Sequence, residues 1–481
     1  MGVLSELQPK RVFYFFEEIC KIPHGSGNTK QISDFCVAFA KDHGLEWHQD
    51  EDNNVIIIKE ATKGYENISP IIIQGHLDMV CEKEADCPID MEKEGLSVYV
   101  DGDLVRAKGT TLGGDDGIAI AMALAILEDN TLEHPRVEAM FTIDEETGMN
   151  GAMSIDVSYL KGHTLLNIDS EDEGIFTVSC AGGNVTRCML PLTTSSFTGE
   201  AIEVKIYGLM GGHSGVEIDR GRANANILMG RLLQAISLEE DIRLVSVDGG
   251  LKDNAIPVEC KSVFVTDNYS RVEELVKEYE QFFIKEHETT DAGIKISCQK
   301  VALSEAQAMD LESTKDSICL LVCLPNGIQT MSHNIEGLVQ TSLNLGVLKT
   351  EEQKLILSYC VRSSVLTEKE MITRRIQILA ERIGATVQVE GNYPGWEYRV
   401  DSPLRSKMVA LFEEMYGKAP KVEAIHAGLE CGLLAGKIKD LDCVSIGPDL
   451  NNIHTPRESM SISSVERVYS YVTELLKRLK D

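Results

Sequence analysis

The first 180 residues alternate between short apolar runs and longer amphipathic segments. The isoleucines at positions 71–73 predict a buried strand, because branched side chains pack well on a sheet that is covered on both faces. Similar runs lie at residues 55–59, 137–143 and 164–168. Residues 7–20 and 31–43 have helical periodicity, and residues 118–128 are apolar nearly all round, as in a buried helix. Strands separated by helices predict an α/β fold with a mostly parallel central sheet flanked by helices.

The pattern changes near Gly182, where a second set of strands and helices begins. Strand-like runs lie at residues 203–207, 260–265, 294–300 and 355–361, and helical segments lie at 222–236, 271–286 and 368–383. A turn-rich segment at 391–396 leads to a helical segment at 403–416, a loop at 426–432, a strand-like run at 443–446 and a last helical segment at 464–479. We therefore expect a discontinuous domain formed by residues 1–182 and 391–481, and a smaller inserted α+β domain formed by residues 183–390.

Histidine and acidic side chains follow the predicted strands of the first domain. His76 and Asp78 follow the isoleucine strand, Asp144-Glu145-Glu146 follow residues 137–143, and Asp169 follows residues 164–168. In such sheets ligands bind beyond the carboxyl ends of the strands, so we expect these side chains to share one edge. His76 and Asp78 point to the same side of an extended chain, which lets the Asp78 carboxylate fix the tautomer of the imidazole.

Two acidic segments each admit two interpretations. Adjacent residues of an extended chain face opposite ways, so Glu146 can hold a metal while Glu145 acts on a water, although three acidic residues in a row also suit a solvated loop. Asp115 and Asp116 open the buried helix, where aspartate commonly serves as a cap. The glycines around them permit backbone conformations that other residues resist, and a carboxylate in a strained turn is often functional.

The combined donor set suggests metal chemistry. Nitrogen comes from His76 and His454, and oxygen comes from Asp115, Glu146 and Asp169. Donors of these two kinds suit Zn²⁺, with Mn²⁺ or Co²⁺ as substitutes. If Asp115 bridges, two terminal donors remain for each of two ions, and Glu145 is left to move a proton from water to a leaving amine. Without cations, so many carboxylates would raise one another's pKa values and destabilise the fold.

Composition narrows the possible partners and the compartment. The net charge of −30 argues against binding to nucleic acids or anionic membranes. The thirteen cysteines lack paired spacing, which favours a reduced, cytoplasmic protein. Charged residues interrupt the amphipathic N-terminal segment, which excludes a signal-peptide core, and no apolar stretch is long enough to span a bilayer.

The order of these motifs resembles a known enzyme family. His76-x-Asp78, Gly113-Gly114-Asp115-Asp116, Asp144-Glu145-Glu146, Asp169 and a late His454 are arranged as in the di-zinc metallopeptidases that include aminoacylase, carboxypeptidase G, the aminotripeptidase and the carnosinase-like dipeptidases. Residues 212–225, 254–257, 393–396 and 426–432 are most similar to the bacterial aminoacyl-histidine (Xaa-His or β-alanyl-histidine) dipeptidases. The resemblance covers essentially the whole chain.

The resemblance implies a role for each residue of the first domain. His76 and Asp169 would hold one zinc ion, Glu146 and His454 would hold the other, and Asp115 would bridge them. Asp78 would orient His76, and Glu145 would be the general base. The family also has a cis peptide bond after its bridging aspartate, which here falls between Asp115 and Asp116.

The inserted domain would correspond to the family's lid and dimerisation domain. His213 would be the lid histidine that reaches the active site of a partner subunit in a homodimer and stabilises the oxyanion, although a polar turn residue is the simpler interpretation. Arg362 could bind the substrate carboxylate as a bidentate partner, although a surface arginine is the more common situation. Asn254 is expected to add a substrate contact, and Glu430 to bind the substrate amino group.

We therefore predict a two-domain metallo-dipeptidase in which two zinc ions activate a water. An aminoacylase-like amidohydrolase and an aminotripeptidase are the enzymatic alternatives. A zinc-binding scaffold without turnover is the alternative from a different class, although the complete ligand set and Glu145 count against it.

Overall fold

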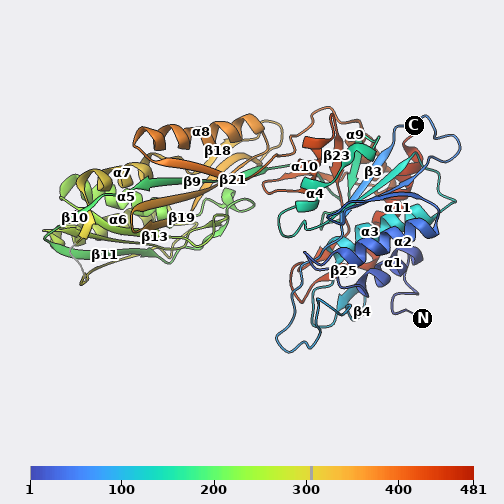
Figure 1. Ribbon diagram of the computed structural model, residues 1–481, viewed down its shortest axis with the longest axis horizontal. Helices are drawn as coiled ribbons and strands as arrows, with labels where there is room; N and C mark the ends of the chain where they lie inside the picture. The colour runs from blue at the N-terminus through green and yellow to red at the C-terminus, as the bar shows by residue number, and fades with distance from the viewer. Residues whose placement is uncertain (1, 304–306, 481) are drawn as a thin grey trace. The chain divides into compact units, whose positions relative to one another are not determined.

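The computed structural model describes residues 2–303 and 307–480, which form two compact units (Figure 1). The first unit consists of Met1–Ser179, Tyr398–Ala424 and Leu429–Asp481, and the second consists of Cys180–Glu397 and Ile425–Gly428. Relative to the boundaries expected from the sequence, the second unit also contains residues 180–182 and 391–397 and the short segment Ile425–Gly428.

The first unit is built on an eight-stranded sheet with the order β1-β2-β6-β3-β7-β23-β8-β22. Its strands are β1 (Glu46–Gln49), β2 (Val55–Lys59), β3 (Ile71–His76), β6 (Val137–Thr142), β7 (Thr164–Asn167), β8 (Ile175–Cys180), β22 (Lys421–Ile425) and β23 (Asp442–Ser445). Strands β6, β3, β7 and β23 pair in parallel, whereas β2 pairs with β6 and β8 pairs with β23 in antiparallel fashion. The parallel pairing that the sequence predicts is therefore found at the centre of the sheet.

Helices cover this sheet and bury its apolar strands. They are α1 (Lys10–Cys20), α2 (Lys30–Asp42), α3 (Gly114–Glu128), α4 (Asn150–Ser154), α9 (Pro403–Tyr416), α10 (Glu430–Lys437) and α11 (Ile462–Arg478), with a 3₁₀ turn at Val157–Tyr159. Helix α3 packs against α1 and β3, and all its residues from Ile118 to Leu127 are buried, as its uniformly apolar sequence predicts. Figure 1 shows α1, α2 and α3 lying together.

A small four-stranded sheet completes the first unit. Its order is β24-β25-β5-β4, with β4 (Val98–Asp101), β5 (Leu104–Ala107), β24 (Leu450–Asn451) and β25 (Ser459–Ser461). Strand β25 pairs with β5. This pairing holds the segment that follows β23 beside the chain that leads into α3.

The second unit contains a mainly antiparallel sheet with the order β16-β11-β15-β13-β19-β20-β9-β21, to which β18 is added beside β19. The strands are β9 (Gly182–Pro191), β11 (Glu200–Tyr207), β13 (Arg243–Gly249), β15 (Cys260–Thr266), β16 (Lys295–Lys300), β18 (Gly327–Met331), β19 (Val339–Glu351), β20 (Lys354–Ser363) and β21 (Thr386–Tyr393). The shorter strands β10 (Thr194–Ser196) and β17 (Gln307–Met309) form one pair, and β12 (Gly212–His213) and β14 (Ala255–Ile256) form another.

Four helices pack with this second sheet: α5 (Ala225–Glu239), α6 (Tyr269–Glu286), α7 (Leu311–Cys323) and α8 (Leu366–Arg382), with a 3₁₀ turn at Ile218–Arg220. The apolar sides of the helices and strands form a large buried core, and a small separate cluster contains Ala201, Val265 and Ala308. In the described parts of the chain, every helix is too short or too polar to cross a bilayer.

Candidate metal centre

The carboxyl ends of parallel strands bring the predicted donors of the first unit together. His76 is the last residue of β3, Asp144-Glu145-Glu146 follow the end of β6, and Asp169 lies two residues beyond β7. Since β6, β3 and β7 run in the same direction, these three ends lie at one edge of the sheet.

The turn before α3 presents Asp115 to this edge. Gly113 has a φ of +67°, and a Cβ atom there would lie 2.8 Å from Met79 Sδ, so only glycine fits without a shift. The Asp115–Asp116 peptide bond is cis, as the family resemblance implies. The Oδ2 of Asp116 accepts a hydrogen bond of 3.1 Å from the backbone N–H of His76.

The two carboxylate oxygens of Asp115 face two different sets of donors. Its Oδ1 lies 3.1 Å from His76 Nε2, and the same nitrogen is 3.5 Å from Asp169 Oδ1. Its Oδ2 lies 3.2 Å from His454 Nε2, which is 2.9 Å from Glu146 Oε1. Asp115 therefore stands between one histidine–carboxylate pair and another, which is the arrangement expected of a bridging ligand.

Three overlapping groups of side chains in the described residues could each hold an ion. They are His76, Asp116 and Asp169; His76, Glu145 and Glu146; and Asp115, Glu146 and His454. In each group one ligand atom per residue lies within 4.8 Å of the others. The donors are imidazole nitrogens and carboxylate oxygens, which fits Zn²⁺, Mn²⁺ or Co²⁺. Asp116 is an additional potential donor that sequence analysis did not assign.

The carboxylates at this edge raise the pKa values of the two histidines. Burial alone would lower the pKa of His76, but hydrogen bonds to Asp115 and Asp169 raise it well above its usual value. Hydrogen bonds to Asp115 and Glu146 raise the pKa of His454 to about 10. The carboxylates thus favour the protonated imidazoles, and a metal ion that binds these nitrogens must displace a proton.

Glu145 has the environment of a proton-transfer group. Burial raises its pKa to about 9, with Asp169 and Glu430 adding to the rise and His76 opposing it. A carboxyl group in such a site readily holds a proton, and bound cations would return it toward the ionised form. Its position beside, rather than within, the two donor pairs around Asp115 leaves its carboxylate free to act on a water.

Asp78 is placed differently from the sequence expectation. The Nδ1–H of His76 donates to the backbone carbonyl of Asp78 at 2.9 Å, while the nearest carboxylate oxygen of Asp78 is 3.6 Å away. That carboxylate instead accepts bonds from the backbone N–H groups of Glu145, at 3.0 Å, and Glu146, at 3.4 Å, and from Ser26 Oγ at 2.7 Å. Asp78 thus fixes the tautomer of His76 through its main chain and positions the Glu145–Glu146 loop through its side chain.

Glu430 begins α10, where the sequence had predicted a loop. Its side chain is fully buried, and its Oε2 accepts hydrogen bonds of 2.6 Å from both Gln74 Nε2 and Thr142 Oγ1. Burial raises its pKa to about 7. Its Oε1 has no hydrogen-bond partner among the described residues, and its role toward a substrate amino group stays a prediction.

A separate cluster of cationic and neutral donors lies within the second unit. His213, Arg362 and the backbone oxygen of His426 lie within 3.2 Å of the position that a Cβ atom on Gly215 would take. Arg362 is 7 % exposed, and its Nε has no hydrogen-bond partner among the described residues, while its Nη1 donates to Tyr393 Oη at 3.4 Å. A buried arginine without a carboxylate partner is unusual, and its guanidinium is suited to an anion.

The two histidines of this cluster are neutral. Burial, followed by the nearby Arg362, lowers the pKa of His213 and lowers that of His426 to about 3. His213 Nδ1 accepts bonds of 3.2 Å from the backbone N–H groups of Gly215 and Val216, so the ring proton is on Nε2 and can be donated. His426 Nε2 lies 2.7 Å from Ser342 Oγ. The segment 426–432 supports the family resemblance, but the sequence predicted no role for His426.

Asn254 is exposed on the loop that precedes β14, and its carbonyl accepts a 2.9 Å hydrogen bond from the N–H of Ser214. Together with His213 it lines a largely apolar hollow formed by the 248–261 segment. Its contact with a substrate stays a prediction.

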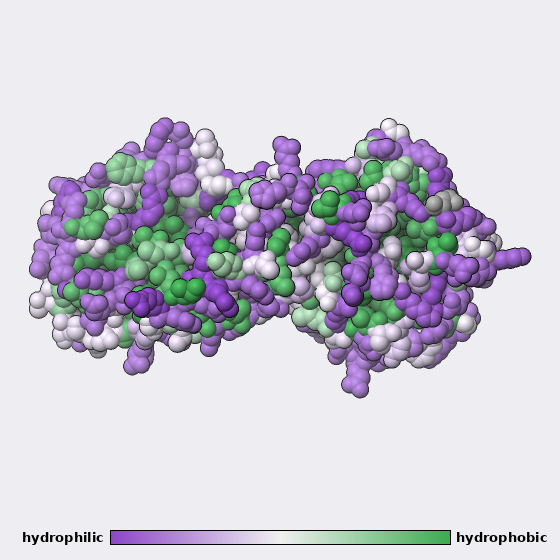
Figure 2. Space-filling view, turned by 90° about the horizontal axis from the view of Figure 1, so that it is seen from above, coloured by the Kyte–Doolittle hydropathy of each residue, from purple (hydrophilic) through white to green (hydrophobic). Residues whose placement is uncertain are grey.

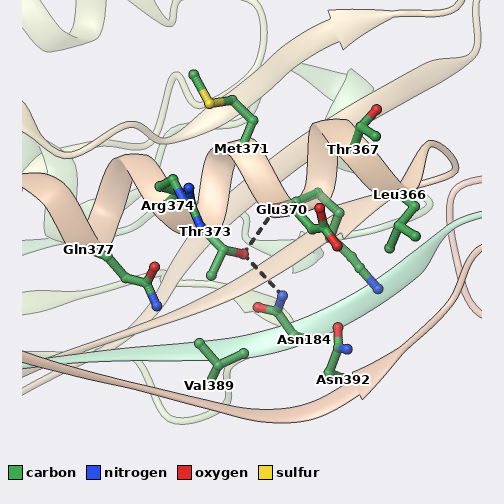
Figure 3. Close-up of a pocket in the computed structure, with 11 residues that line it drawn as sticks. Asn184, Leu366, Thr367, Glu370, Met371, Thr373, Arg374, Gln377, Val389 and Asn392 are labelled. Atoms are coloured by element: carbon green, nitrogen blue, oxygen red, sulfur yellow. Dashed lines mark hydrogen bonds between the residues drawn. The ribbon is translucent and has the colours of Figure 1, made fainter.

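Another hollow, of about 730 Å³, lies between α8 and the strands β9 and β21 (Figure 3). Asn184 Nδ2 donates to Thr373 Oγ1 at 3.1 Å, and Thr373 in turn donates to the backbone of Lys369, so these polar groups satisfy one another. The described residues that line it include no histidine or cysteine, and it lacks the donor set of the metal centre.

Comparisons with known proteins agree with the geometry. Residues 72–478 match the model of the peptidase family M20/M25/M40. The chain is 36 % identical over 483 aligned residues to the cytosol non-specific dipeptidase of Escherichia coli (strain K12), an alignment that covers 100 % of this chain and 99 % of that protein. The crystal structure of aminoacylhistidine dipeptidase from Vibrio alginolyticus superimposes with a TM-score of 0.95 at 36 % identity, covering 99 % of this chain and 98 % of that one.

More distant structures share the fold alone. Aminopeptidase PepT from Bacillus cereus superimposes with a TM-score of 0.56 at 14 % identity, covering 99 % of this chain and 100 % of that one.

The family resemblance inferred from the motifs is confirmed. The chain belongs to the peptidase family M20/M25/M40.

Proposed function

We propose that this chain is a metal-dependent dipeptidase that acts on Xaa-His dipeptides, including β-alanyl-histidine, and that it uses two zinc ions. Peptidases of its family depend on metal ions. The names of its relatives, a non-specific dipeptidase and an aminoacylhistidine dipeptidase, support a dipeptide substrate. The observation that carries the proposal is the Asp115 carboxylate, whose two oxygens each face one histidine and one further carboxylate.

The proposed ligand roles follow from that observation. His76 and Asp169 would hold one ion, Glu146 and His454 would hold the other, and Asp115 would bridge them. When bound, such ions polarise a peptide carbonyl and lower the pKa of water from about 16 to about 7. Zn²⁺ is proposed because the donors are nitrogen and carboxylate, with Co²⁺ or Mn²⁺ as substitutes.

The chain's own residues would then move the protons. Glu145 takes a proton from the attacking water as the oxygen bonds to the peptide carbonyl carbon. It delivers that proton to the amine nitrogen as the carbon–nitrogen bond breaks, so one water is consumed and two amino acids leave. Asp78 supports this transfer because it anchors the backbone of Glu145 and Glu146.

The second unit is proposed to recognise the substrate's anionic groups. Arg362 is buried and lacks a carboxylate partner, so it is the candidate for the free carboxylate of a dipeptide. His213 carries its proton on Nε2 and is the candidate donor to the developing oxyanion, supplied from a partner subunit as the family resemblance implies.

A homodimer formed through the second unit, located in the cytoplasm, completes the proposal. Leu366, Met371 and Ile378 of α8 are 46 %, 57 % and 62 % exposed, and apolar surface of this kind suits a subunit contact. Figure 2, which looks onto the side of the second unit where α8 lies, shows apolar patches among hydrophilic residues. The thirteen cysteines are all free, which is consistent with a reducing compartment.

An activity panel tests the function directly. The metal-free protein should be inactive and should regain hydrolysis of β-alanyl-histidine and other dipeptides when Zn²⁺ is restored. Faster hydrolysis of a tripeptide would favour an aminotripeptidase, and a preference for N-acetyl amino acids would favour an aminoacylase-like enzyme. Zinc binding without hydrolysis of any of these compounds would indicate a scaffold. Sedimentation analysis of the purified protein would test the dimer.

A further inference from the structure

A buried glutamate outside the predicted ligand set connects the turn that carries Asp115 to the loop that carries His454. Glu458 is 3 % exposed and lies immediately before β25. Its Oε2 accepts hydrogen bonds from the backbone N–H groups of Leu112, at 2.8 Å, and Gly113, at 3.2 Å. Its Oε1 accepts a third bond, of 2.8 Å, from the N–H of Gly114. The N–H of Asp115 adds a longer bond of 3.5 Å to Oε1, so one carboxylate accepts from four consecutive N–H groups that end at Asp115.

These bonds supply what the turn itself lacks. The N–H groups at the beginning of a helix have no acceptors inside the helix, and here they belong to the segment that enters α3. Gly113 and Gly114 add little stiffness, because glycine has the largest backbone freedom of any residue. An ionised carboxylate is a strong acceptor for several N–H donors at once. The direction of the Asp115 side chain therefore depends on an acceptor that comes from a distant part of the sequence.

The same carboxylate belongs to the loop that carries His454. The N–H of Glu458 donates to the carbonyl of Thr455 at 3.0 Å, and Thr455 Oγ1 donates to the carbonyl of Asn452 at 2.7 Å. These bonds close the loop on both sides of His454, whose φ of +59° is unusual for a residue other than glycine. Glu458 is four residues beyond His454, so a shift of the loop moves the histidine and the acceptor together.

We propose that Glu458 is a positioning residue that fixes Asp115 in its bridging orientation and keeps it in register with His454. The proposal rests on the proposed function of the metal centre. Glu458 itself binds neither ion, because both of its oxygens are occupied by backbone N–H groups. Its effect is therefore on the affinity for the pair of ions.

The variant Glu458→Gln tests this with little change in shape. An amide has one acceptor oxygen and places an NH₂ group against at least one backbone N–H, so the turn loses part of its anchor. The metal-free full-length chain would be titrated with Co²⁺, and binding would be followed by visible absorption. Loss of an outer-shell partner typically costs about 10–100-fold in metal affinity, and we expect a loss in that range together with an altered Co²⁺ spectrum.

Glu138→Gln is the matched control. Glu138 is also fully buried and also accepts bonds from consecutive backbone N–H groups, those of Lys161 and Gly162, both at 3.0 Å. It lies near the start of β6, at the opposite end of the strand from Glu145 and Glu146. We expect this control to lower the melting temperature of the metal-free protein but to bind Co²⁺ with the wild-type affinity and spectrum.

The outcomes separate this inference from the proposed function. A folded Glu458→Gln protein with wild-type Co²⁺ affinity and spectrum would overturn the positioning role while leaving the metal centre intact. Equal losses of affinity in Glu458→Gln and Glu138→Gln would also overturn it, because they would indicate a general effect of destabilisation. A wild-type protein that binds no pair of ions would refute the metal centre itself, and the positioning role with it. Circular dichroism of the metal-free variants would establish that they are folded.

Discussion

The polar clusters of the two units have opposite chemistry. In the first unit, Asp115, Glu146 and Asp169 surround two imidazoles, and in the described chain no lysine or arginine forms an ion pair with them. In the second unit, Arg362 is buried beside two neutral histidines and has no carboxylate partner among the described residues. Among the described residues, the carboxylates of the first cluster outnumber the imidazoles and no fixed cation faces them, and in the second cluster Arg362 faces no carboxylate; an unpaired buried charge is costly. The comparison teaches that the first unit is organised for cations and the second for an anion.

The largest effect should come from removing the proton-transfer group of the first unit. Glu145→Gln keeps the size of the side chain but cannot take a proton, so kcat for a dipeptide should fall by about 10²–10⁴-fold. Metal content should stay unchanged, because the other donors remain. Steady-state kinetics and metal analysis of the same preparation provide the measurement.

Asp144→Asn is the control for this loop. Asp144 precedes Glu145 and accepts a 2.6 Å bond from the N–H of Gly27, and asparagine tolerates its φ of +53°. Its kcat should change by less than about tenfold, since it takes no part in proton transfer. A Glu145→Gln enzyme as active as the Asp144→Asn enzyme would show that another group is the base.

The next effect should come from removing one direct ligand. His454→Ala deletes the nitrogen that faces Asp115 Oδ2 and Glu146 Oε1, so one of the two ions should be lost or weakened by more than the roughly 100-fold typical of an outer-shell change. The ion held by His76 should remain. Metal analysis after dialysis against a weak chelator would measure this, and retention of both ions would contradict the ligand assignment.

A change in the second unit should alter substrate binding rather than metal content. In Arg362→Ala the substrate loses a charge-assisted bond worth about 1.5–3 kcal/mol, which raises KM for a dipeptide by roughly 10–100-fold. A dipeptide amide lacks the carboxylate and should be a poor substrate for the wild type and the variant alike. If Arg362→Ala raised KM for the amide by the same factor, the cluster would not be a carboxylate site.

The smallest effect is on the pH dependence of stability. His426 has a pKa of about 3 in the folded protein, whereas an unfolded chain protonates histidine near 6.5, so the unfolded state gains protons first as the pH falls. This residue should therefore remove about 2 kcal/mol of stability between pH 7 and pH 5. His426→Asn should flatten the fall in melting temperature over that range relative to the wild type. An unchanged slope would mean that His426 is protonated in the folded protein.

The shared edge of His76, Glu146 and Asp169 could be predicted from the sequence because it depends on local rules. Donors that follow β3, β6 and β7 share one edge whenever those strands are parallel, and apolar runs revealed all three strands. Helix α9 was predicted with its observed bounds, because Ser402 caps it, Pro403 is its first residue and Gly417 follows its end.

The remaining features depend on contacts between distant segments. Glu458 looks like a surface residue in the sequence, and its function is visible only when β25 is paired with β5 beside the Gly113–Gly114 turn. Strand β9 and helix α7 were missed because β9 begins with small and polar residues and α7 is rich in serine, threonine and cysteine, so their apolar periods are weak. The Asp78 carboxylate was assigned to His76 because spacing alone does not reveal the turn that directs it to the N–H groups of Glu145 and Glu146.

The central claim is that Asp115 is shared by two ions, and a crystal structure of the zinc-loaded protein measured at the zinc absorption edge tests it most directly. The account predicts two anomalous peaks, one contacting His76 and Asp169 and the other contacting Glu146 and His454, with one Asp115 oxygen on each. A single peak, or two peaks of which either does not touch Asp115, would contradict it.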